Sequence, residues 1–134
     1  MTSAKDQIKR DEGFRGNVYQ CTAGANTIGY GRNLDQNPLT EEEAEYLLDN
    51  DLKKVAQQSQ QFAFYQHLKP ERRAVIINMI FNLGLTRFNK FKKLQSALFI
   101  EDYEKAAEEM LDSRWARQVG QRAERLAKIM RRGK

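Results

Sequence analysis

Three side chains near the start of the chain have types and a spacing that suit acid–base chemistry. They are Glu12, Cys21 and Thr27. Glu12 precedes Gly13, a residue that commonly ends a helix because it tolerates positive φ. A carboxyl group at the negative end of a helix dipole is favoured in its protonated form, which suits a general acid. The stretch from residue 11 to residue 32, rich in glycine and polar groups, therefore predicts a site.

A β-hairpin is expected to carry two of these three side chains. Residues 18–21 and 27–30 alternate as strands do, and the turn-forming residues 22–26 join them. This pairing predicts that Cys21 and Thr27 face each other across the hairpin. Threonine is also a common strand residue, and a lone cysteine is often a small buried hydrophobe, so both residues keep a structural alternative.

Helices should account for most of the remaining chain. Ser3 and Asp6 resemble a capping box for a first helix over residues 4–12 that presents Glu12. A polar connection over residues 32–38 follows the hairpin. Thr40 and Glu43 form a second capping box, and the spacing of apolar residues after it predicts a long helix over about 41–60.

Four further helices follow in the second half of the chain. Pro70 begins one that is apolar nearly all round until Gly84, so we expect it to be a buried axis. Large apolar residues at positions 88, 91, 94, 98 and 99 predict another. We expect Asp102 to cap the third, and Gly120 precedes a short basic helix over 121–130. The fold class is therefore mainly α (α+β), with the β content confined to the hairpin.

Length, cysteine usage and hydropathy limit the organisation of the protein. The chain of 134 residues suits a single domain, and its one cysteine allows no intrachain disulfide, in agreement with a reducing compartment. Residues 1–7 have no apolar run resembling a signal peptide, and no stretch approaches the ~20 apolar residues of a membrane span. We expect a soluble monomer made in the cytoplasm, without stable membrane insertion.

Charge is distributed unevenly. Residues 35–51 hold seven acidic residues and no Lys or Arg, whereas residues 114–134 hold eight basic residues and one acidic residue, a net charge of +7. Such a segment attracts anionic partners, although it is also compatible with a solvated helical surface. No nucleic-acid-binding motif accompanies it, so we expect no nucleic-acid partner. His67 is the only histidine, and we assign no metal and no cofactor.

The order of several motifs resembles the T4-type phage lysozyme and endolysin family, glycoside hydrolase family 24. Glu12, Cys21 and Thr27 are followed by Ile-Gly-Tyr-Gly. The later motifs are Leu-Thr-Glu-Glu-Glu-Ala-Glu at 39–45, Arg-Arg-Ala at 72–74, Ile-Asn-Met-Ile-Phe-Asn-Leu-Gly at 77–84, Ser-Arg-Trp at 113–115 and Arg-Ala at 122–123. Each motif alone is weak, whereas their order over nearly the whole chain is specific.

The resemblance implies a lysozyme-like fold in one domain over residues 1–134. A small lobe with the hairpin would cover about 13–45 and a linking helix about 41–60. A helical lobe would cover about 61–134 together with the N-terminal helix. The cleft between the two lobes would hold the substrate.

The resemblance also implies the activity and its residues. The protein would be an endolysin that hydrolyses the β-1,4 bond between N-acetylmuramic acid and N-acetylglucosamine in bacterial peptidoglycan and so lyses the host cell. Glu12 would be the acid, Thr27 would hold the attacking water, and Arg122 would orient Glu12. Residues expected to bind or support the substrate are Tyr30, Arg32, Phe81, Asn82, Arg114 and Arg122.

Two positions depart from the family pattern: Cys21 stands where the pattern has Asp, and Arg32 stands where the T4 protein has His. An unperturbed thiol has a pKa of ~8.5, so it is mostly neutral at pH 7 and a poorer base than a carboxylate. No cation beside Cys21 in the sequence would lower that pKa. Cys21 is therefore left as base, nucleophile or packing residue, and the reaction as inverting or retaining.

Two other functions remain open. A lytic transglycosylase would need Glu12 alone and would close an anhydro sugar ring. A catalytically inactive domain that binds wall or nucleic acid would be the outcome if activity were lost with the Asp. An endolysin would act on the wall after release from the host cytoplasm, which implies a holin or another release factor.

Overall fold

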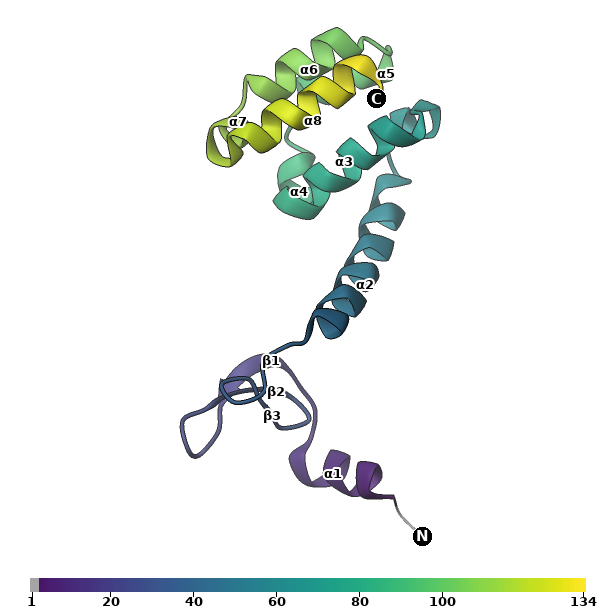
Figure 1. Ribbon diagram of the computed structural model, residues 1–134. Helices are drawn as coiled ribbons and strands as arrows, with labels where there is room; N and C mark the ends of the chain where they lie inside the picture. The colour runs from purple at the N-terminus through teal and green to yellow at the C-terminus, as the bar shows by residue number, and fades with distance from the viewer. Residues whose placement is uncertain (1–2) are drawn as a thin grey trace. The chain divides into compact units, whose positions relative to one another are not determined.

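A computed structural model describes residues 3–134, which divide into two compact units. Unit 1 extends to Leu47 and unit 2 covers Leu48–Lys134. Eight α-helices, one 3-10 helix and a three-stranded sheet make up the described chain, which confirms the mainly α class (Figure 1). No helix in this range is long and apolar enough to cross a membrane. Met1 and Thr2, the start of the segment without a signal-peptide pattern, lie outside the described residues.

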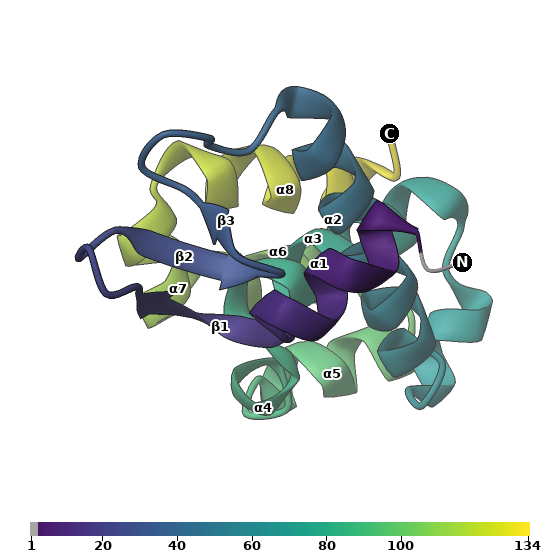
Figure 2. The same cartoon turned by 90° about the horizontal axis from the view of Figure 1, so that it is seen from below.

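Unit 1 begins with the predicted helix and hairpin. Helix α1 (Ala4–Glu12) leads into a sheet of β1 (Arg15–Gln20), β2 (Asn26–Gly29) and β3 (Arg32–Asn33), all antiparallel with β2 in the centre (Figure 2). The third strand was not predicted, because two residues are too few to show alternation. It occupies the start of the segment expected to be a polar connection.

The register of the sheet corrects one prediction. Thr27 pairs with Tyr19 on β1 and with Asn33 on β3, so Cys21 is not its cross-strand partner. Cys21 lies just beyond β1, where its N–H donates to the Ala25 carbonyl at 3.0 Å and its own carbonyl accepts from Gly24 N–H at 2.8 Å. A tight turn therefore closes the hairpin one residue pair beyond the strands.

Both predicted caps of unit 1 are present. Ser3 Oγ accepts the Asp6 N–H at 3.1 Å at the start of α1. At the other end, Gly13 has φ +70° and its N–H donates to Lys9 O at 3.0 Å, which ends the helix directly after Glu12. The sequence thus fixes the residue at which the helix stops, and with it the place of Glu12.

Helix α2 (Glu41–Ser59) contains the boundary between the units and matches the predicted long helix. Its capping box is complete: Thr40 N–H donates to Glu43 Oε1 at 2.9 Å, and Glu43 N–H donates to Thr40 Oγ1 at 3.1 Å. Three glutamates in its first turn favour the positive end of the helix dipole.

Unit 2 is a group of short helices. After α2 come the 3-10 helix η1 (Ala63–His67), α3 (Pro70–Leu83), α4 (Leu85–Phe88), α5 (Lys92–Phe99), α6 (Tyr103–Leu111), α7 (Arg114–Val119) and α8 (Gln121–Arg132). Helix α6 packs against α5 and α8, and α8 also packs against α3 (Figure 1). Asp102 caps α6 as predicted, with its carboxylate accepting the Lys105 N–H at 3.0 Å.

Two expectations for unit 2 need correction. Helix α3 buries one face, including Ile76 and Met79, while Phe81 on another face is 44% exposed, so α3 is not buried all round. The helix expected to run through Phe88 and Phe99 is two helices, because the backbone of Phe91 leaves the helical region at ψ 65°. Phe88 is fully buried on α4, where its ring stacks with Phe91 and meets Phe62 edge to face.

Arg72 joins the ends of three helices in unit 2. Its Nε donates to Met130 O at 2.7 Å and its Nη2 to Arg131 O at 3.2 Å, so it satisfies carbonyls at the end of α8. The guanidinium lies 3.6 Å from the centre of the Tyr103 ring on α6. The start of α3 thereby holds α8 and α6 together.

Candidate functional site

Glu12 lies against the backbone of Gly31 in the turn between β2 and β3. A Cβ atom on Gly31 would be 2.6 Å from Glu12 Oε2 and 2.7 Å from its Cδ, closer than side-chain atoms can approach. Gly31 also has φ +76°, a conformation that favours glycine. The missing side chain at residue 31 therefore makes room for the carboxyl group that the end of α1 presents.

Tyr30 packs against the other side of the junction between α1 and the sheet. Its ring lies 5.7 Å from that of Phe14, and Lys9 Nζ is 5.4 Å from its centre. Tyr30 is also 44% exposed, so part of the ring is open to solvent. These contacts hold the last turn of α1 against the hairpin, which positions Glu12.

The turn of the hairpin lowers the pKa of the Cys21 thiol. Backbone hydrogen bonds from Ala25 and Ala23 favour the thiolate, with a smaller contribution from the Thr27 side chain, and together they outweigh desolvation. The sequence indicated no cation that would lower this pKa, and main-chain donors are not visible in a sequence. The structure thus provides a cause for the lowered thiol pKa that the sequence left open.

Thr27 is the buried member of the group, with 3% of its surface exposed. Its hydroxyl donates to Ala25 O at 3.0 Å, and the same hydroxyl is a hydrogen-bonding neighbour of Cys21. Because one hydroxyl carries one proton, it can donate to the carbonyl or to the thiolate, not to both at once. In the structure the proton goes to Ala25 O.

Arg32 is engaged within unit 1. Its guanidinium donates to both carboxylate oxygens of Glu43, to Asn37 O at 2.9 Å and to Pro38 O at 2.7 Å. Hydrogen bonds from Arg32 and Thr40 lower the pKa of Glu43 to about 2. Arg32 therefore ties the segment after β3 to the start of α2, a role that the sequence did not indicate.

The remaining four predicted residues, Phe81, Asn82, Arg114 and Arg122, belong to unit 2, and Asn82 and Arg122 make side-chain hydrogen bonds to other helices. Asn82 Oδ1 accepts the indole N–H of Trp115 at 2.8 Å, which links α3 to α7. Arg122 donates from Nε at 3.1 Å and from Nη2 at 2.7 Å to Asn78 Oδ1, which links α8 to α3. Trp115 is buried. The predicted residues are thus divided between two local groups, one in each unit.

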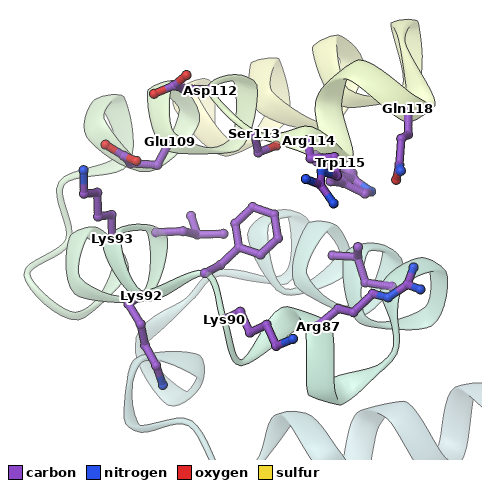
Figure 3. A pocket seen from close by; sticks show the side chains of 13 residues that line it. Arg87, Lys90, Lys92, Lys93, Glu109, Asp112, Ser113, Arg114, Trp115 and Gln118 are labelled. Carbon is purple, nitrogen blue, oxygen red and sulfur yellow. The ribbon is translucent and has the colours of Figure 1, made fainter.

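A cavity of about 660 Å³ in unit 2 includes Arg114 and Trp115 in its wall. Figure 3 shows Arg114 and Trp115 on one side, with Arg87 and Lys90 on the other. The complete lining is Leu83, Arg87, Lys90, Phe91, Lys92, Lys93, Leu94, Glu109, Asp112, Ser113, Arg114, Trp115 and Gln118. Five cationic side chains against two carboxylates make this an environment for an anionic or polar ligand.

Sequence reasoning missed the cations on the α4 and α5 side of this cavity. They occur in a short run, Arg87-Phe88-Asn89-Lys90-Phe91-Lys92-Lys93, in which basic and aromatic residues alternate. That run could have indicated a basic surface, but the spacing of its aromatic residues equally indicates the buried face of a helix. Within residues 3–134, no cluster of three His, Cys, Asp or Glu side chains could hold a metal ion.

Comparison with known proteins places these features in one family. The family description Phage lysozyme matches residues 9–134. The chain is 34% identical to an endolysin of Acyrthosiphon pisum secondary endosymbiont phage 1, over 93% of the chain and 86% of that protein. It is 26% identical to probable T4-type lysozyme 2 of Dictyostelium discoideum, over 99% of the chain and 96% of that protein. The pre-baseplate central spike protein Gp5 of phage T4 is 29% identical, over 98% of the chain and 28% of Gp5.

Proposed function

Because the chain belongs to the phage lysozyme family, we propose that it is an endolysin that hydrolyses the β-1,4 bond between N-acetylmuramic acid and N-acetylglucosamine. The family and the related endolysin support a lysozyme function and a peptidoglycan substrate in general. The particular bond, and lysis of a host, are our proposal. The observation that carries it is the Glu12 carboxyl group held over Gly31 beside the hairpin that bears Cys21 and Thr27.

In this proposal Glu12 donates a proton to the leaving glycosidic oxygen. The bare backbone of Gly31 leaves room for the carboxyl group beside the hairpin, and a donor within reach of the leaving oxygen is what general acid catalysis needs. Thr27 helps to hold the water that attacks the sugar. Cys21 assists as a partly ionised thiol, and the main-chain donors that lower its pKa favour the thiolate.

Residues of unit 2 would bind the glycan or its peptides. Arg114 and Trp115 line the cationic cavity, and Asn82 fixes the indole of Trp115. Phe81 exposes part of its ring on α3, and an exposed ring can stack on the apolar face of a sugar. We propose that Arg122 is a positioning residue, because its guanidinium is held by Asn78.

The test is digestion of purified peptidoglycan, with the sugar ends identified by mass spectrometry. New reducing ends are expected from a hydrolase. Anhydro ends would instead assign a lytic transglycosylase that uses Glu12 alone, and no products would assign a binding domain.

Thr27→Val keeps the β-branched shape and removes the hydroxyl, so we expect slower cleavage. A fully active Thr27→Val protein would limit Thr27 to a structural role.

The basic segment after residue 113 is proposed to hold the protein on the anionic wall. Cleavage of intact wall should weaken as salt reduces the Debye length below ~10 Å, while cleavage of a short soluble oligosaccharide should change little. Parallel loss on both substrates would show that salt acts on the site or on the fold.

We further propose a monomer that reaches the wall from the host cytoplasm through a holin or another release factor.

A further inference from the structure

Two large apolar side chains are exposed side by side at the end of α5. Phe99 is 68% exposed and Ile100 is 70% exposed, the highest value for a large hydrophobic residue within residues 3–134. The preceding turns of the same helix bury Leu94, Ala97 and Leu98. The helix therefore packs fully through one face and leaves an apolar end uncovered on another.

Lysines surround this apolar end. Lys92, Ser96 and the adjacent pair Phe99 and Ile100 follow at intervals of three or four residues, so they form one exposed stripe along α5 and its C-terminal end. Shallow depressions on the surface join Ile100 to Lys92, Lys93 and Lys105, and Phe99 to Lys92. We call Lys92, Lys93, Phe99 and Ile100 the α5 surface, which Lys90 precedes in the chain.

The lysines of the α5 surface are free of ion pairs. Among residues 3–134, Lys90, Lys92 and Lys93 have no carboxylate within 4.0 Å, whereas Lys105 is paired with Glu109 at 3.2 Å. The carboxylates that follow Ile100 are mostly occupied: Asp102 caps α6, and Glu104 accepts from Arg131 at 2.9 Å. Glu101 and Asp102 add negative charge at this end, and Glu109 and Asp112 line the cavity that Lys92 and Lys93 share.

We propose that the α5 surface binds peripherally to a bilayer of anionic phospholipid. Phe99 and Ile100 would enter the boundary between headgroups and acyl chains, and the lysines would contact lipid phosphates. Apolar side chains bordered by unpaired lysines are the combination that such an interface favours, because burial and charge attraction both contribute. The binding is reversible and involves no helix that crosses the membrane.

The two apolar residues of the α5 surface are separate from the residues assigned to glycan cleavage and binding. Its lysines are not, because Lys92 and Lys93 also line the cavity beside Arg114 (Figure 3). Phe99 and Ile100 do not line that cavity. The two apolar residues can therefore be changed without altering the proposed active site.

The experiment measures cosedimentation of the full chain with vesicles of phosphatidylglycerol and phosphatidylcholine, or of phosphatidylcholine alone. The wild type should bind the anionic vesicles preferentially. The double substitution Phe99→Ser with Ile100→Ser should reduce the binding constant by about tenfold or more, because the apolar surface of both side chains would no longer move from water into the bilayer. Tyr46→Ser, at a site with the same 68% exposure on α2, is the matched control and should bind as the wild type does.

A second pair of variants separates α5 from the basic C-terminal helix. Lys92→Gln with Lys93→Gln should weaken binding to anionic vesicles by about tenfold and reduce its salt dependence. Arg125→Gln with Lys128→Gln removes the same charge from α8 and should have a smaller effect. Thermal unfolding and cleavage of a soluble oligosaccharide should be unchanged in the Phe99 and Ile100 double variant, because both side chains are exposed.

A fluorescence measurement tests insertion directly. Phe99→Trp adds an exposed indole, while the native Trp115 is buried. Anionic vesicles should shift the emission of the variant to shorter wavelength and leave the wild type unchanged. The proposal is overturned by equal binding to neutral vesicles, by an equal loss from the α8 pair, or by binding only to a lipid-free anionic wall polymer.

Discussion

Residues 3–47 and residues 48–134 are held together by different kinds of contact. Every buried apolar residue of the described chain lies between Val55 and Met130, in unit 2. In the described part of unit 1, Thr27 is the only buried residue. Unit 1 relies instead on helix caps, a tight turn and the Arg32 network. The proposed proton donor and thiolate thus belong to the part with little core.

The difference suggests a division of labour. Burial of apolar surface is the main source of stability, and unit 2 supplies it. Backbone hydrogen bonds and turn residues define the positions of the proposed reacting groups, and both lie in unit 1. Substitutions in unit 1 should therefore change activity more than stability, and substitutions in the core of unit 2 should do the reverse.

Glu12→Gln provides the largest expected effect. The amide keeps the shape of the side chain and cannot donate the proton, so cleavage should fall by about 10²-fold or more. The midpoint of thermal unfolding should not change, because Glu12 is exposed. Peptidoglycan clearance and calorimetry measure the two quantities. Clearance near the wild-type rate would remove Glu12 from the mechanism.

Ile76→Ala tests the other side of the comparison. Ile76 is fully buried on α3, so its truncation should lower the free energy of unfolding by about 2–5 kcal/mol. Urea denaturation provides the measurement, and Phe99→Ser, at an exposed position, should stay within about 0.5 kcal/mol of the wild type. Equal losses in the two variants would contradict the view that the core is confined to the buried cluster.

Gly31→Ala sharpens the comparison within unit 1. The new methyl group would meet the Glu12 carboxyl group, and alanine is disfavoured at φ +76°. Displacement of the carboxyl group should lower kcat by about tenfold to 10²-fold, with a smaller effect on KM. Gly24→Ala, also at positive φ but without a neighbour within 4 Å, is the matched control for backbone strain. Similar rates in both variants would mean that strain alone is responsible.

Cys21 should tolerate one substitution and not another. Cys21→Asp supplies an ionised group and should remain active, whereas Cys21→Ser should be slower by about tenfold or more, because its hydroxyl does not ionise near neutral pH. Alkylation should inactivate the wild type and spare Cys21→Asp. A Cys21→Ser protein with the wild-type rate would show that Cys21 fills space only.

The smallest effect concerns the Arg32 and Glu43 pair. The folded pKa of Glu43 is about 2, below its ordinary value of 4.5, so ionised Glu43 stabilises the fold above pH 4.5 and loses that contribution as the pH falls toward 2. Glu43→Gln keeps a capping residue and removes the charge. The difference in unfolding midpoint between wild type and variant should shrink with acidification. A constant difference would indicate packing, not ionisation.

The features that could be predicted from sequence are those coded by neighbouring residues. Ser3 and Gly13 delimit α1, and Thr40 with Glu43 starts α2, because caps act over three or four residues. Motif order in turn identified the family. The family pattern also selected the candidate residues, whose roles in catalysis and binding remain predictions.

The features that escaped prediction depend on contacts without a local pattern. The network of Arg32 joins residues up to eleven positions away, and the partners of Cys21 are main-chain groups. Strand β3 has only two residues, and the break at Phe91 interrupts an apolar spacing that still fits a helix. In each case tertiary context decides between local alternatives.

The turn that closes the hairpin has a consequence for how position 21 can evolve. Its anion-stabilising groups are mainly N–H groups of the peptide backbone, which every residue except proline carries. Exchange between a carboxylate and a thiol at position 21 can therefore proceed without compensating mutations at residues 23 and 25. The turn can therefore accept different acidic side chains at position 21 by substitution of that residue alone. Only a change in the backbone path of the turn, such as proline at residue 25, would remove this tolerance.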